Sequence, residues 1–69
     1  MENPLLIDLA VKYGLDDAQV IKISHVLHQA GAGEDERMFV RLAEYICEEK
    51  LVDEPAEVLL EELKRKDLI

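Results

Sequence analysis

The chain of 69 residues has few of the features that small proteins use to reinforce a fold or to carry out chemistry. It contains one cysteine, Cys47, so no disulfide can form within the chain, and it has no tryptophan. A secreted domain of this size usually carries several cysteines. The first residues, Met1 to Pro4, lack the basic side chains that open a signal peptide. These absences predict a protein of the cytoplasm, and the initiator-like Met1 predicts a complete small protein.

Long apolar runs and basic residues are also scarce. No apolar stretch approaches the ~20 residues of a transmembrane helix, so no membrane association is expected. Sixteen acidic residues against eight basic ones give a net charge of -8. Residues 34–69 hold twelve of the acids and six of the bases, a net charge of -6. Such a surface repels nucleic-acid phosphates and attracts basic protein surfaces, so direct nucleic-acid binding is disfavoured and a basic protein partner is expected.

Glycine and proline are few, but they divide the chain into four segments with helical periodicity. The breaks fall at Gly14, at residues 31–33 and at residues 53–55. We expect helices over residues 4–13, 17–30, 34–51 and 55–67, because apolar residues recur there every three or four positions. The sequence therefore predicts an all-α fold, a compact four-helix domain with short loops that occupies residues 1–69.

The residues at the expected helix starts include typical N-caps. Asn3 precedes Pro4, and proline is tolerated at the first helical position. Asp16 and Gln19 have the spacing of a capping box. An acidic residue at 53 or 54, Asp53 or Glu54, is expected to cap the last helix. The apolar stripes of the second and third helices predict these core residues: Val20, Ile23, Val26, Leu27, Ala30, Phe39, Leu42, Ala43, Ile46 and Cys47.

A second pattern combines a small residue, a turn glycine and later apolar residues: Ala10, Gly14, Leu15, Val20 and Ile23. With these residues, segment 6–25 resembles a helix-turn-helix, in which the small residue lets two helices cross closely. In DNA-binding members of that class, the start of the second helix faces the base edges. This chain has Asp16, Asp17 and Gln19 at that position, and two carboxylates there oppose DNA binding.

No pattern typical of catalysis or of a bound cofactor is present. Cys47 lies on the apolar face of its helix, which is typical of an inert core residue. His25 and His28 share a helix face but lack a second pair of ligands, so no metal site is predicted. The glycines at 31 and 33 precede three acidic residues, which repel a phosphate. We expect no enzymatic activity, no cofactor and no metal.

Two groups of residues are candidates for contact with a partner. Ile21 departs from the apolar stripe of its helix and shares a side with His25 and His28, so either this strip is exposed or another helix covers it. The second group consists of acidic residues of the third helix, where charge reversal is expected to weaken binding. The candidate interaction residues are Ile21, His25, His28, Glu44, Glu48 and Glu49.

The sequence favours a small acidic, non-catalytic protein-interaction module, a regulator or adaptor that binds a basic protein surface. One alternative is a nucleic-acid-associated regulator of the helix-turn-helix type. Another is a DNA mimic that inhibits a DNA-binding protein. A homodimer is also compatible with the sequence, because small domains often gain stability by pairing.

Overall fold

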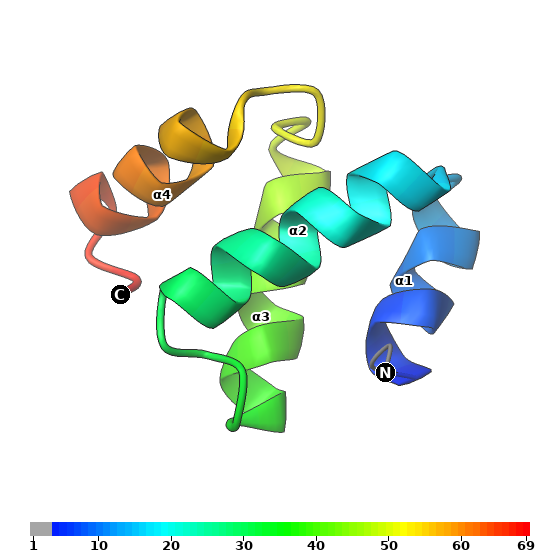
Figure 1. Ribbon diagram of the computed structural model, residues 1–69, viewed down its shortest axis with the longest axis horizontal. Helices are drawn as coiled ribbons and strands as arrows, with labels where there is room; N and C mark the ends of the chain where they lie inside the picture. The colour runs from blue at the N-terminus through cyan, green and yellow to red at the C-terminus, as the bar shows by residue number, and fades with distance from the viewer. Residues whose placement is uncertain (1–3) are drawn as a thin grey trace.

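Four α-helices form the part of the chain that the computed structural model describes, residues 4–69. Helix α1 spans Pro4–Tyr13, α2 spans Asp17–Gln29, α3 spans Glu36–Glu48 and α4 spans Ala56–Arg65. In Figure 1, α2 crosses in front of α3, with α1 on one side and α4 on the other. Helix α1 packs on α2 and α3, and α2 also packs on α3 and α4. The predicted all-α, four-helix fold is confirmed; Asn3, the expected first N-cap, lies outside the described residues.

The helices enclose one apolar core. The stripes predicted on α2 and α3 are buried, apart from Ala30, which is half-buried. Helix α1 adds Leu6 and Leu9 to this core, and α4 adds Leu59 and Leu63. Within the described residues, no polar or charged residue is buried, so burial of apolar surface is the main stabilising contribution of this core.

Each helix ends in the same type of turn, in which the chain reverses and returns an apolar residue to the core. The backbone N–H of that residue donates to a carbonyl in the last helical turn, as in a Schellman motif. The four hydrogen bonds join Leu15 to Ala10, Ala32 to Leu27, Leu51 to Ile46 and Leu68 to Leu63, at 2.8 to 2.9 Å. The residue before each returning residue has a positive φ: Gly14, Gly31, Lys50 and Asp67.

These turns correct the predicted ends of the last two helices. The third helix was expected to continue to Leu51, but it ends at Glu48 because Lys50 adopts φ 57° and turns the chain. The fourth was expected to continue to Asp67, but it ends at Arg65 because Asp67 adopts φ 59°. Leu68 consequently packs back against the core.

The first turns of α2 and α3 have side-chain caps. The predicted capping box is present: the Asp16 carboxylate accepts from the Gln19 N–H at 2.8 Å, and the Gln19 side-chain oxygen accepts from the Asp16 N–H at 2.9 Å. Helix α3 begins at Glu36, two residues later than expected. Its N-cap is Asp35, whose carboxylate accepts from the Met38 N–H at 3.1 Å.

The start of α4 differs from the expectation. The residue at the N-cap position is Pro55, and no side chain caps this helix. The prediction that Asp53 or Glu54 caps α4 is therefore wrong. Both acids precede the N-cap position, which Pro55 occupies, and the Asp53 carboxylate accepts a hydrogen bond from Gln19 of α2.

Candidate interaction surface

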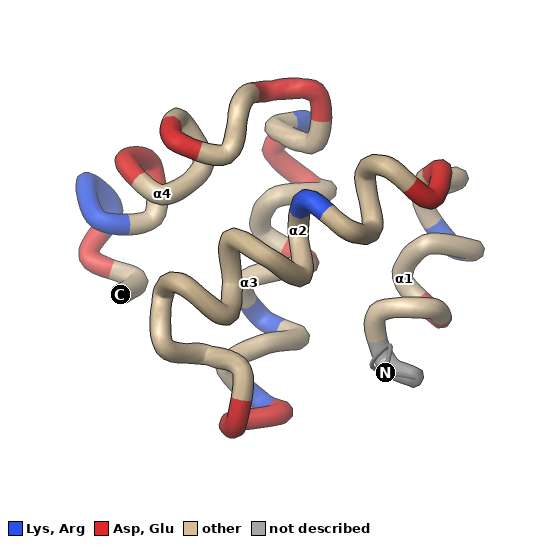
Figure 2. The backbone as a smooth tube through the Cα atoms, viewed as in Figure 1, with Lys and Arg blue, Asp and Glu red and all other residues tan. Residues whose placement is uncertain are grey.

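Two long-range hydrogen bonds bring three acidic segments to one end of the molecule. The hydroxyl of Tyr13, at the end of α1, donates to the carboxylate of Glu48, at the end of α3, across 3.4 Å. The side-chain amide of Gln19 donates to Asp53, in the loop before α4, across 2.9 Å. Figure 2 shows the resulting arrangement: acidic backbone segments at the start of α2, at the end of α3 and in the loop that follows.

We call this surface the acidic end, and it consists of Asp16, Asp17, Glu48, Glu49, Asp53 and Glu54. All six residues are exposed. The segments that contain them, residues 12–17 and 48–54, carry these six acids and two bases, Lys12 and Lys50. Because the carboxylates are in water, salt screens their mutual repulsion, and they remain available to a cationic partner.

Gln19 has a specific part in this arrangement. Its side-chain oxygen accepts a hydrogen bond from the Asp16 N–H, and its side-chain nitrogen donates one to the Asp53 carboxylate. One neutral amide therefore links the N-cap of α2 to the α3–α4 loop. The positive end of the α2 dipole also favours carboxylates at this position. Sequence reasoning identified the capping box but missed the contact with Asp53, which is 34 residues away.

The three acidic candidates on the third helix occupy different positions. Glu48 and Glu49 belong to the acidic end. Glu44 lies one turn before Glu48 and is half-buried, so it is outside this set. Burial raises the pKa of the neighbouring Cys47 thiol, and the negative charges of Glu48 and Glu44 raise it further.

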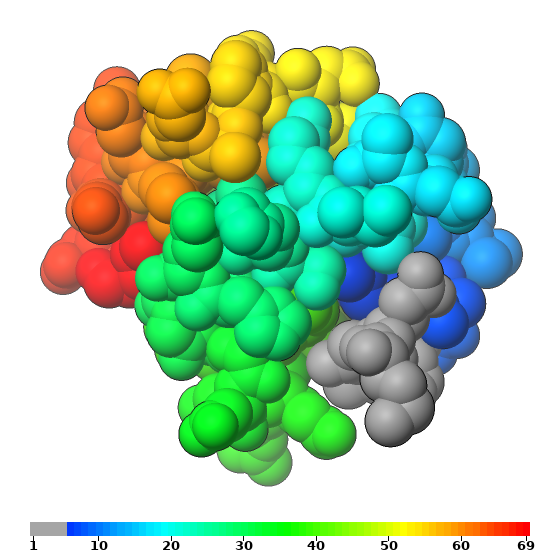
Figure 3. All heavy atoms as spheres, viewed as in Figure 1, coloured from blue at the N-terminus to red at the C-terminus, as the bar shows by residue number. Residues whose placement is uncertain are grey.

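The predicted strip on α2 is open at Ile21. This side chain is 63% exposed, so no other helix of the described chain covers it. In Figure 3, α2 forms the middle of the visible face, between α4 and α1. His25 is also exposed, and its Nε2 atom lies 3.1 Å from the side-chain nitrogen of Gln29.

His28 is held against the rest of the protein by several contacts. Its Nδ1 atom lies 2.7 Å from the carbonyl oxygen of Ser24. The ring meets the ring of Phe39 edge-on, with centroids 6.1 Å apart and planes at 78°. It also covers Gly33, where a Cβ atom would lie 2.6 Å from the imidazole. The imidazole therefore joins α2 to the turn before α3, although the residue keeps an exposed edge.

Sequence reasoning missed two exposed apolar residues on α1. Ile7 is 44% exposed and Val11 is 80% exposed. Their exposure was predictable from the sequence, because both residues lie off the apolar stripe that carries Leu6 and Leu9. They are four positions apart and share one side of the helix.

The described residues contain no group of three or more His, Cys, Asp or Glu side chains placed to hold a metal ion. Cys47 is 8% exposed, which limits access to its sulfur. The longest helices in residues 4–69 have 13 residues, and none of the helices there has the length and apolar character to span a bilayer.

Comparison of the chain with models of known protein families, with curated proteins and with solved structures finds no match. No relative therefore supplies an activity or a partner by analogy.

Proposed function

We propose that this protein is a small, non-catalytic interaction module that binds a basic surface of another protein through its acidic end. The observation that carries the proposal is the convergence of carboxylates from three segments. The Gln19–Asp53 hydrogen bond joins the loop after α3 to the start of α2, and the Tyr13–Glu48 hydrogen bond joins the end of α3 to the end of α1. A cationic surface facing this end meets several carboxylates at once.

The physical properties of the acidic end set the kind of binding. Exposed charges contribute mainly to the rate of association and to the choice of partner, and their effect falls with ionic strength. The excess of acids over bases also repels anionic surfaces. We therefore expect a regulator or adaptor whose complexes form quickly and weaken in salt. Its location in the cytoplasm remains a prediction from the single cysteine.

A related candidate is inhibition of a DNA-binding protein by imitation of DNA charge. The start of α2, which faces DNA in helix-turn-helix proteins, here carries Asp16 and Asp17. The Gln19 amide is engaged with Asp16 and Asp53, so it is not free to contact a base. These features favour a cationic DNA-binding protein as the partner over DNA itself. A gel shift with the protein alone tests direct DNA binding.

The experiment compares two triple variants with the same change in charge. One variant, Glu48→Lys, Glu49→Lys and Glu54→Lys, reverses charge at the acidic end. The control variant makes the same change at three exposed residues elsewhere: Glu34, Glu57 and Glu61. Each protein is immobilised and exposed to native lysate at low and high salt, and circular dichroism confirms its helical fold.

We expect the wild type and the control variant to retain the same basic protein at low salt and to release it at high salt. The acidic-end variant should not retain it. Equal loss of retention in both variants would show that only net charge matters, and full retention by both would show that these carboxylates are not needed. Either result would refute a defined binding surface at the acidic end.

A further inference from the structure

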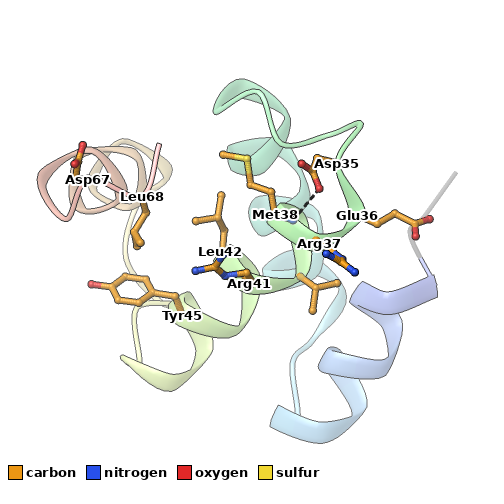
Figure 4. Close-up of a pocket in the computed structure, with 10 residues that line it drawn as sticks. Asp35, Glu36, Arg37, Met38, Arg41, Leu42, Tyr45, Asp67 and Leu68 are labelled. Atoms are coloured by element: carbon orange, nitrogen blue, oxygen red, sulfur yellow. Dashed lines mark hydrogen bonds between the residues drawn. The ribbon is translucent and has the colours of Figure 1, made fainter.

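The outer face of α2 differs in charge from the rest of the chain. Residues 18–33 form the longest stretch without an acidic side chain, and Lys22 is the one basic residue in it. Figure 2 shows α2 without acidic residues beyond its first turn. The groove beside α3 is different, because charged residues of both signs line it (Figure 4). A second strongly acidic molecule therefore meets the least repulsion at the outer face of α2.

Four exposed residues form a seam along this face: Ala18, Ile21, His25 and His28. They are separated by three, four and three positions, so they lie on one side of the helix, opposite its buried stripe. The same spacing is typical of the contact line between two paired helices. The seam contains no carboxylate and no ammonium group, and the centre of a protein interface is likewise poor in charged residues.

The seam is complementary to itself when two copies of α2 run antiparallel. Ile21 of one copy then faces His25 of the other copy. Ala18 faces His28 in the same way, so a small side chain lies opposite a large one. The His28 ring already packs edge-on against Phe39, so pairing costs little of its side-chain entropy. Each contact occurs twice, as a two-fold interface requires.

We propose that α2 pairs antiparallel with α2 of a second copy of this chain through this seam. Charge selects both the occupant and the direction. A basic partner is attracted to the acidic end and not to a face without carboxylates. The acidic end includes Asp16 and Asp17 at the start of α2, and antiparallel helices keep these residues of the two copies apart. The inference goes beyond the proposed function and does not depend on it.

The length of the seam limits the strength of pairing. One short helix on each side buries less than the ~1,200 Å² of a standard stable interface. We expect a dissociation constant on the order of 0.1 to 1 mM. The chain is then a monomer at the ~10 μM concentrations of unfolding measurements, and it pairs only where it is concentrated.

The test is sedimentation equilibrium from about 10 μM to about 1 mM protein, near pH 8, where histidine is normally neutral. Ile21→Glu places a carboxylate in the seam. Val11→Glu is the matched control, because it adds the same charge at an apolar residue of α1 that is 80% exposed. His25→Leu is a third variant, which adds apolar contact with Ile21 of the second copy. Circular dichroism confirms that each variant is folded.

We expect Val11→Glu to dimerise like the wild type and Ile21→Glu to dimerise at least about tenfold more weakly. His25→Leu should dimerise about tenfold more tightly. High salt should strengthen the dimer, because it screens the repulsion between two negative chains, whereas it weakens binding of a basic protein to the acidic end. A wild type that stays monomeric throughout, or equal dimerisation of the two glutamate variants, would overturn the proposal.

Cross-linking tests the direction of pairing. Ile21→Cys and His25→Cys are made separately in a Cys47→Ala background, one of them with a tag that changes its size, and the two proteins are mixed and oxidised. The antiparallel seam predicts that disulfides between the two different variants form faster than those between identical ones. A preference for disulfides between identical variants would indicate parallel helices and would overturn the proposal.

Discussion

The side-chain amide of Gln19 donates to the carboxylate of Asp53 across 2.9 Å, and this contact ties the first turn of α2 to the loop before α4. Gln19→Glu tests it selectively, because glutamate still suits the third position of a capping box. It cannot donate to Asp53, however, and it adds a like charge there. We expect urea denaturation to show a loss of about 0.5 to 1.5 kcal/mol in the free energy of unfolding.

Asp53→Asn in the Gln19→Glu background is the matched control. The asparagine amide can donate to the introduced carboxylate, so stability should return close to that of the wild type. High salt should also reduce the loss in the single variant, since it screens the repulsion between the introduced carboxylate and Asp53. A Gln19→Glu protein as stable as the wild type at low salt would contradict the contact.

The ends of α1 and α3 allow a comparison of opposite substitutions. Lys50 has φ 57° and Gly14 has φ 68°, in the same type of turn. This backbone conformation costs an L-residue roughly 1 kcal/mol relative to glycine. Lys50→Gly should raise the free energy of unfolding by about 0.5 to 1 kcal/mol, after the entropy of the unfolded glycine is subtracted.

Gly14→Ala should lower stability by about 1 kcal/mol through backbone strain alone, because nothing lies within 4 Å of the added Cβ atom. Urea unfolding measures both changes in stability, that of Lys50→Gly and that of Gly14→Ala. A destabilising Lys50→Gly would show that the lysine side chain contributes more than its backbone conformation costs.

These turns also explain how far the sequence could predict the fold. Gly14 marked the end of α1 correctly, and Gly31 marked the end of α2 to within one residue, because glycine is the usual residue at a positive φ. Lys50 and Asp67 occupy the same position without that signal, so α3 and α4 were predicted too long. The capping box of Asp16 and Gln19 was predictable because both partners lie within one turn of chain.

The candidate surface was less predictable, because it depends on contacts between distant segments. The sequence identified Glu48 as a candidate interaction residue, but only the fold places it beside Tyr13. The stripe of α2 left Ile21 unassigned, since one helix alone does not show whether a neighbour covers it. Leu68 packs back against the core because Asp67 turns the chain, and helical periodicity does not contain that information.

The Cys47 thiol should be slow to react. Its pKa is raised, chiefly by burial and further by Glu48 and Glu44, so little thiolate forms near neutral pH. We expect a disulfide reagent such as DTNB to modify the native protein about a hundredfold more slowly than the urea-unfolded chain. Similar rates in the two states would contradict the buried position.

Ionisation of the Cys47 thiol should lower the free energy of unfolding at alkaline pH. Because its pKa is higher in the folded protein than in the unfolded chain, the unfolded thiol loses its proton first as pH rises. The stabilising contribution is complete below the unfolded pKa and is lost as pH rises through the folded pKa. Cys47→Ala should remove this part of the pH dependence, at a cost of about 1 kcal/mol for the lost side-chain volume.

Ile21 and Ile23 are a matched pair on α2. Ile21 is 63% exposed, whereas Ile23 is 0% exposed. Ile21→Ala should change the free energy of unfolding by less than about 0.5 kcal/mol, but Ile23→Ala should cost about 2 to 4 kcal/mol. Thermal or urea unfolding measures both. A large loss at Ile21 would mean that a second chain covers this residue in solution.

The salt dependence of the partner's dissociation constant shows whether binding occurs through the acidic end. It is measured for the wild type, for the variant reversed at Glu48, Glu49 and Glu54, and for the control reversed at Glu34, Glu57 and Glu61. We expect wild-type binding to weaken about tenfold between about 50 and 300 mM salt, and the acidic-end variant to bind at least about tenfold more weakly than the control. A dissociation constant that does not change with salt and is equal in the two variants would show that the acidic end is not the binding surface.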